Sequence, residues 1–243
     1  MNSKDRFTRV DVMAIPAPPF TKTWHPIPHR EVIEGLQKVV DAKGIGIRQE
    51  TYSVTNKGNN MFGAWTLDVE QDGKYVQVGF RNSISKDFAV GICAGTFVVV
   101  CSNMQFRGEF VEFRKHTSGL DPEEILLLGS RAFNKVLDEG RLLIEWQNQL
   151  RDYPLTSVDF KCITFDAMRE GIFGANHFNA FLNAHGEEAR LAGEHSLYTF
   201  HGAVTRMIRG INLFSIDERT RTLANLCDAY AIEYNVRMSK AGR

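Results

Sequence analysis

Residues 75–117 read YVQVGFRNSISKDFAVGICAGTFVVVCSNMQFRGEFVEFRKHT, and this stretch decides the fold of the 243-residue chain. Within it, residues 76–80 alternate between large apolar and small or polar side chains, the period of two that is typical of a strand with one buried face. Residues 96–101 are almost all apolar or β-branched, which predicts a central strand covered on both faces. Residues 106–116 alternate less regularly and indicate a strand near the edge of the sheet.

The segments before this stretch extend the predicted sheet. Residues 44–55 and 61–69 have strand-like sequences on either side of a polar turn at 56–60, and the triplet Gln-Asp-Gly at 71–73 favours a hairpin. Residues 30–43 place their apolar side chains on one helical face, so a helix is predicted to lead into the first strand. About five mostly antiparallel strands are therefore expected.

The chain after residue 120 is predicted to be mainly helical. Asp121 and Pro122, followed by two glutamates, are typical of a helix start, and this helix is expected to run to about Leu150 with Gly140 loosening its middle. The apolar run at 158–163 predicts a return to the sheet as an edge strand. Further helices are expected at 165–172, 175–184, 196–209 and 217–235.

These elements predict an α+β fold, in which a central, mostly antiparallel sheet is packed by a long helix and followed by a helical C-terminal half. We expect a single domain over residues 1–243, divided into an arm at 1–28, a helix plus sheet at 30–120 and a mainly helical part at 121–243. The arm holds five prolines within thirteen positions, which excludes a regular helix and favours an extended chain. Such an arm either packs along the sheet or reaches a neighbouring subunit.

Composition excludes several classes of protein. The 29 basic residues balance the 29 acidic ones, so any contact with nucleic acid must come from a local patch. No segment is apolar enough to span a membrane, and the first twenty residues lack the apolar stretch of a signal peptide. We therefore expect a cytoplasmic protein with no membrane partner. The four cysteines are widely spaced, which predicts buried thiols in a reducing compartment: Cys93, Cys101, Cys162 and Cys227.

Several motifs carry a resemblance to a known family. GFRNS at 79–83, VVVCSN at 98–103 and RKHT at 114–117 are similar, at these spacings, to the signature of the phage- and plasmid-borne family described as domain of unknown function nine-three-two. The similarity begins at WHPIPHREVI, 24–33. It extends to HSLYTFHGAVTRMIRG at 195–210 and RTRTLANLCDAY at 219–230, and so covers most of the chain.

The resemblance implies that the chain is an accessory protein of a mobile genetic element, located in the cytoplasm of the host cell if a phage encodes it. Members of the family often carry a histidine directly after the Asn-Ser pair, where this chain has Ile84. This departure from the family pattern argues against a metal-binding or acid–base histidine at that position. The order helix, sheet, helix is also similar to that of single-strand annealing proteins of the Rad fifty-two type, as an analogy of fold alone.

One set of residues has the side chains of a cysteine-nucleophile site. In such a site a histidine removes the thiol proton and an amide orients the imidazole, the roles that His116 and Asn103 would have toward Cys101. The alternative is a buried, inert thiol at the end of an apolar strand, since no helix N-terminus follows to lower the pKa of the thiol. We expect the alternative, and hence a protein without catalytic activity.

A polar loop supplies a second candidate. Arg81, Asn82 and Ser83, with Lys86 nearby, could hold a phosphate or a nucleic-acid backbone. The alternative is a turn in which Asn82 and Ser83 bond to their own backbone, and this is the reading we favour.

Aromatic and basic residues also interleave in the last predicted strand, where Arg107, Arg114 and Lys115 lie among phenylalanines. That mixture is used to stack exposed bases and follow a phosphate chain, although phenylalanines in a strand usually belong to the core. The functional hypothesis is therefore a non-enzymatic protein that binds single-stranded nucleic acid. The alternative is a protein–protein module, such as an inhibitor of a host defence complex or a self-assembling oligomer that uses the arm.

No cofactor is expected, because the sequence has neither a P-loop nor the glycine fingerprint of dinucleotide binding. A metal site is not expected either. His25 and His29 have the spacing of a helical ligand pair, but Pro26 and Pro28 prevent the helix that would bring them together.

Overall fold

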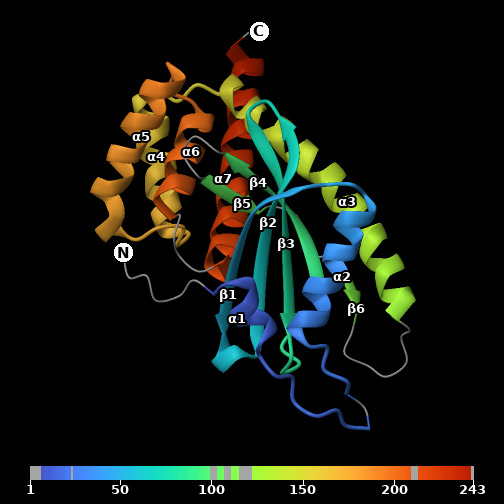
Figure 1. Ribbon diagram of the computed structural model, residues 1–243. Helices are drawn as coiled ribbons and strands as arrows, with labels where there is room; N and C mark the ends of the chain where they lie inside the picture. The colour runs from blue at the N-terminus through green and yellow to red at the C-terminus, as the bar shows by residue number, and fades with distance from the viewer. Residues whose placement is uncertain are drawn as a thin grey trace.

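An antiparallel sheet forms the centre of the computed structural model, which describes residues 7–22, 24–98, 103–106, 111–114, 122–208 and 213–241 (Figure 1). Its four long strands lie in chain order and each pairs with the next: β1 (Ile47–Thr55), β2 (Asn60–Gln71), β3 (Lys74–Ser83) and β4 (Val90–Val98). Two short strands share the outer edge of β4, namely β5 (Asn103–Phe106) and β6 (Val111–Arg114). The predicted α+β class is confirmed. The strand count differs from the expected five, because there are four long strands and two short ones.

The edge of the sheet beyond β4 differs from the single strand predicted over residues 106–116. Gly95 pairs with Phe106 of β5, and Ile92 pairs with Val111 of β6. The two positions are three residues apart along β4, but their partners are five residues apart in the sequence. Two extra residues therefore interrupt the pairing. The end of the apolar run at 96–101 lies outside the described residues.

The tight turn between β2 and β3 is the one that the sequence predicts. Asp72 and Gly73 both have positive φ, 53° and 72°. Two consecutive residues of this kind make a turn whose twist matches that of the flanking strands, and Asp-Gly is a favoured pair for it. Beyond the turn the pairing shifts between Thr66 and Glu70, where β2 has two more residues than β3. The shifted register places Val78 opposite Trp65 and Asn82 opposite Met61.

Helices cover both faces of the sheet. On one face lie α2 (His29–Ala42) and α3 (Pro122–Gln149), which share a buried core with the side chains of Val76, Val78 and Phe80 (Figure 1). On the other face, Phe62, Ala64, Cys93 and Phe106 pack against the start of α7 (Leu213–Ala241). The alternation predicted for residues 76–80 is thus confirmed, but both faces of β3 are buried instead of one.

Gly140 allows α3 to pack closely against β3 of the sheet. A Cβ atom at this position would lie 2.6 Å from Cγ1 of Val76, closer than real Cβ contacts allow. The residue expected to loosen the middle of the helix instead permits the helix to pack on β3.

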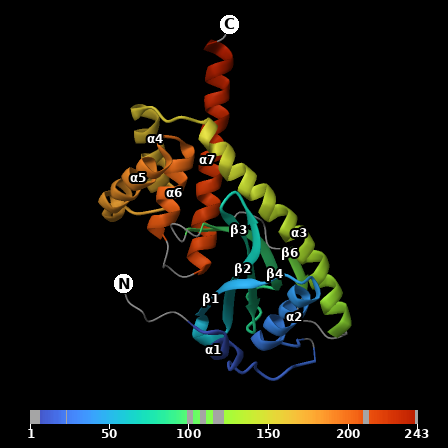
Figure 2. The same ribbon diagram turned by 45° about the horizontal axis from the view of Figure 1, so that its top comes forward.

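The helical half surrounds a second core. Its helices are α4 (Ser157–Arg169), α5 (Phe178–Ala192) and α6 (Leu197–Ile208), with the middle of α7 completing the bundle. Short 3-10 turns lie at Asn56–Gly58 (η1), Leu150–Asp152 (η2) and Ala175–His177 (η3). Figure 2 shows the far end of α7 extending beyond the other elements.

The edge strand predicted at residues 158–163 is wrong, because these residues belong to α4. The Thr156 side chain accepts a hydrogen bond from the backbone of Asp159, and the Asp159 carboxylate accepts one in return from the backbone of Thr156. This reciprocal capping fixes a helix start two residues before the apolar run. Ile163 and Ala167, four residues apart, then face the core.

The start of the N-terminal arm packs along its own sheet, as in the first of the two predicted arrangements, whereas residues 19–22 are exposed. Phe7 forms a β-bridge with Tyr52 of β1, and the Arg9 guanidinium pairs with Glu50 and lies 5.2 Å from the Trp65 ring centroid. The prediction of no regular helix within residues 1–28 is wrong at one place. A short helix, α1 (Arg9–Met13), precedes the prolines and starts at a capping box that Thr8 forms with its third helical residue.

We expect Gly140→Ala to lower the free energy of unfolding by about 1–2 kcal/mol, because the new methyl group collides with Val76. Gly186→Ala is the matched control. It lies within α5 with nothing within 4 Å of its Cβ position, and we expect a gain of about 0.5–1 kcal/mol from helix propensity. Urea unfolding of both variants tests the packing, and equal stabilisation by the two alanines would contradict it.

Candidate nucleic-acid interface

Asn82 lies at the end of β3 and connects the sheet to the arm. Its side-chain amide donates to the backbone carbonyl of Ile27 at 2.8 Å and to Nδ1 of His29 at 2.9 Å. The other ring nitrogen of His29 lies 2.9 Å from the carbonyl of Gly58 in η1. A carbonyl can only accept, so Nε2 carries the hydrogen and Nδ1 is left to accept from Asn82. We refer to these residues, Ile27, His29, Gly58 and Asn82, as the arm latch.

The arm latch is buried, since Asn82 and His29 are each 0% exposed. Burial lowers the pKa of His29, because removal from water penalises the charged imidazolium more than the neutral ring. Asn82, predicted as a nucleic-acid contact or a turn residue, has its amide hydrogens directed to the arm instead. Two of the motif segments quoted above, 24–33 and 79–83, meet at this point.

Ser83 folds the loop that follows β3, residues 84–89, which we call the sheet-end loop. Its hydroxyl accepts hydrogen bonds from the backbone N–H groups of Ser85 and Asp87. This is the self-bonded turn that we favoured from the sequence, and Ser83 is itself fully buried. The carboxylate of Asp87 accepts from the side chains of Asn56 and Asn60, and the hydrogen bond from Asn60 is the main cause of its lowered pKa.

Arg81 extends from the opposite face of β3 toward α7. Its guanidinium carbon lies 4.9 Å from the ring centroid of Phe88, in the sheet-end loop. Phe88 in turn contacts Phe214 of α7, with ring centroids 6.2 Å apart. The positive charge of Arg81 also acts on Asp217 of α7. Burial raises the pKa of Asp217, whereas the nearby charges of Arg221 and Arg81 lower it.

Asp217 is held mainly by Arg221, one helical turn later. The guanidinium of Arg221 donates to both carboxylate oxygens, at distances of 2.9–3.0 Å. Such a two-point pair fixes the carboxylate in place and shields it.

Lys86 lies on the arm side of the sheet-end loop. Its ammonium group is 4.9 Å from the ring centroid of Trp24. The backbone of Trp24 pairs with that of Thr21, which turns the arm back on itself. This turn brings Phe20 and His25 into a parallel stack, with ring centroids 5.3 Å apart and planes 9° apart.

The remaining predicted contacts can be placed only in part. Arg114 ends β6, and its backbone pairs with Val90 while that of Arg81 pairs with Gly91. The two arginines therefore occupy the same end of the sheet, on opposite sides of β4. Arg107 and Lys115 lie outside the described residues.

Most residues of the cysteine-nucleophile hypothesis also lie outside the described residues. Cys101 and His116 are outside the described residues, and Asn103 is described only as the first residue of β5. Of the other cysteines, Cys93 is buried, which raises the pKa of its thiol well above the usual range, and Cys227 is buried too. Cys162 is exposed on α4, contrary to the prediction.

Sequence reasoning missed Phe20, Trp24 and Phe88. Phe20 and Trp24 lie in the arm, where the prolines were the dominant signal, and Phe88 follows a charged residue in what reads as a loop. The usable signal was the alternation of aromatic and basic residues between 20 and 25, read together with Lys86.

Comparison of the chain with family models, with curated proteins and with solved structures finds no match. In the described part of the chain, no group of three or more histidine, cysteine or acidic side chains could hold a metal ion. None of the helices described is both long and apolar enough to cross a membrane.

We expect Asn82→Ala to lower the free energy of unfolding by about 2–3 kcal/mol, because it leaves the Ile27 carbonyl and the His29 ring without their buried donor. It should also expose the arm to proteolysis at a lower protease concentration than the wild-type chain requires. Asn183→Ala, at an exposed position of α5, is the control and should change stability by less than about 0.5 kcal/mol. Equal effects of the two substitutions would show that the latch does not hold the arm.

Proposed function

We propose that the protein binds single-stranded nucleic acid, without altering it chemically, at the end of the sheet that carries the sheet-end loop. The observation that carries this proposal is the pairing of cations with aromatic rings on both sides of that loop: Lys86 with Trp24 and Arg81 with Phe88. Proteins that bind single strands combine cations, which track the phosphates, with rings on which bases stack.

The charges at this end of the sheet support the proposal. The acids near the loop are already engaged within the chain, Asp87 by two asparagines and Asp217 by Arg221. Lys86 is exposed, and its contact with a ring leaves the ammonium group able to pair with a phosphate. A role in a mobile genetic element is part of the proposal and rests on the motif resemblance alone, since no family model matches the chain.

A protein–protein module remains the second proposal, on a different observation. Three apolar side chains are exposed near the end of α7, with exposed fractions of 64% for Ile232, 45% for Val236 and 55% for Met238. They lie within the last ten residues of α7, the helix whose C-terminal end extends beyond the other elements in Figure 2. Ile232 and Val236 are one helical turn apart and share a face of α7, and exposed apolar side chains on a common face favour contact with another protein surface.

The test is a titration of the full chain into a labelled single strand of about twenty nucleotides, at roughly 50 and 200 mM salt. We expect binding that weakens with salt, and Lys86→Glu should reduce the affinity roughly tenfold and make the salt dependence shallower by about one counterion.

Lys161→Glu makes the same change of charge on α4, at an exposed position outside the proposed site, and should leave the affinity unchanged. No binding by the wild-type chain, or equal losses in the two variants, would overturn the proposal. Light scattering on the same samples tests the second proposal, since a monomer at every concentration used would count against self-assembly.

A further inference from the structure

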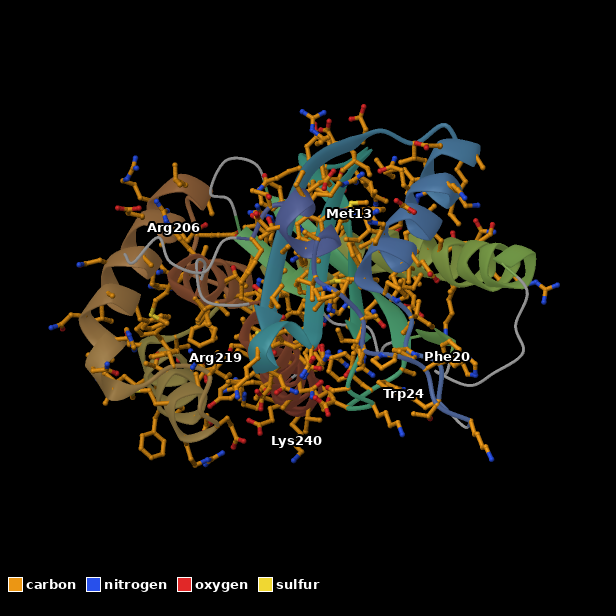
Figure 3. All side chains as sticks on the ribbon, turned by 60° about the horizontal axis from the view of Figure 1, so that its bottom comes forward. Met13, Phe20, Trp24, Arg206, Arg219 and Lys240 are labelled. Carbon is orange, nitrogen blue, oxygen red and sulfur yellow. The ribbon has the colours of Figure 1, made fainter. Side chains whose placement is uncertain are left out.

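The arm turn, made of residues 20–22, 24 and 25, presents an aromatic surface that the fold does not use. Phe20 is 74% exposed although it is a large apolar residue, and its only ring contact among the described residues is the stack on His25. Figure 3 shows Phe20 and Trp24 together on the arm, well separated from Arg206 and Arg219. One face of the Phe20 ring is thus available for a third ring.

The turn is held rigidly enough to present that face. Two backbone hydrogen bonds join Thr21 and Trp24, at 2.8 and 3.4 Å. A few residues later the arm latch anchors Ile27 and His29 to the sheet. A ring that is already ordered loses little entropy when a partner stacks on it, which makes it a better binding element than a free one.

Basic side chains surround this surface. Lys22 is exposed within the turn, and Lys86 contacts Trp24 from the sheet-end loop. The Trp24 indole nitrogen is buried and has no hydrogen-bond partner among the described residues. Stacking rings bordered by cations fit unpaired bases joined by phosphates, and they do not fit a duplex, in which the faces of the bases are covered.

We propose that the arm turn is a base-stacking platform, on which an unpaired base extends the His25–Phe20 stack while Lys22 and Lys86 contact the adjoining phosphates. This inference rests on the proposed function and assigns to the arm the selection of single strands over duplex. The arm, predicted from sequence as a protein-interaction element, thereby becomes part of the nucleic-acid site.

The test compares Phe20→Ala, Phe20→Tyr and Val10→Ala in the full chain. Val10 is the matched control, because it is an equally exposed apolar residue of the N-terminal segment, 75% against 74%. Each protein is titrated with a labelled oligothymidine of about twenty nucleotides, with a duplex of the same length, and with inorganic polyphosphate as a competitor that has charge but no bases.

We expect Phe20→Ala to weaken single-strand binding roughly tenfold, since stacking contributes about 1–3 kcal/mol per base. Phe20→Tyr should restore it, Val10→Ala should have no effect, and competition by polyphosphate should be the same for every variant. Duplex should bind the wild-type chain more weakly than the single strand does.

The outcomes separate this inference from the proposed function. If Lys86→Glu weakens binding but Phe20→Ala does not, the site binds phosphates and the platform is wrong. If Phe20→Ala changes the molar mass in light scattering and leaves oligothymidine binding intact, the exposed ring belongs to a protein contact and the platform is again wrong. If the wild-type chain binds no single strand, the proposed function fails and the platform fails with it.

Discussion

The hydrogen bonds of Asn82 to Ile27 and His29 are the interaction on which the rest of the site depends. They join the end of β3 to the last residues of the arm and to the first residue of α2, and His29 continues the connection to Gly58. The Asn82 amide and the His29 ring are polar and buried, so breaking one of their hydrogen bonds costs more than breaking a bond at the surface would. The position of the arm relative to the sheet is therefore fixed by a few buried atoms.

The proposed surface follows from that constraint. Because the arm is anchored beside the sheet-end loop, Lys86 meets Trp24, and Phe20 stacks on His25 only a few residues before the anchor. On the other side of the same loop, Phe88 lies between Arg81 and α7. The sheet-end loop thus lies between Trp24 of the arm and Phe214 of α7. Hydrogen bonds of Ser83 and Asp87 stabilise its conformation.

The elements that were predicted correctly are those whose sequence signals lie within a few residues of one another. The Asp72-Gly73 turn, the apolar face of α2 and the proline at the start of α3 are each encoded within a few residues, and each is found in the structure. The strand predicted at 158–163 failed because an apolar run of six residues suits a buried helix as well as a strand. The capping pair that decides it, Thr156 and Asp159, was in the sequence and was not used.

The candidate site was less predictable, because its contacts join distant parts of the chain. Asn82 and His29 are 53 residues apart, and nothing in either local sequence says that one is the partner of the other. Arg81 was singled out by its neighbours in the motif, but Phe88 and Trp24 become recognisable only when the loop and the arm are placed together.

The protonation of His29 is the most direct test of the arm latch. Long-range proton–nitrogen correlation by NMR at neutral pH should show a neutral ring with the hydrogen on Nε2, bonded to Gly58, and an unprotonated Nδ1 that accepts from Asn82. Because the pKa of His29 is lowered, this form should persist as the pH falls below the usual value for histidine, about 6.5. A ring protonated on Nδ1, or one that titrates like a free histidine, would contradict the latch and with it the placement of the arm.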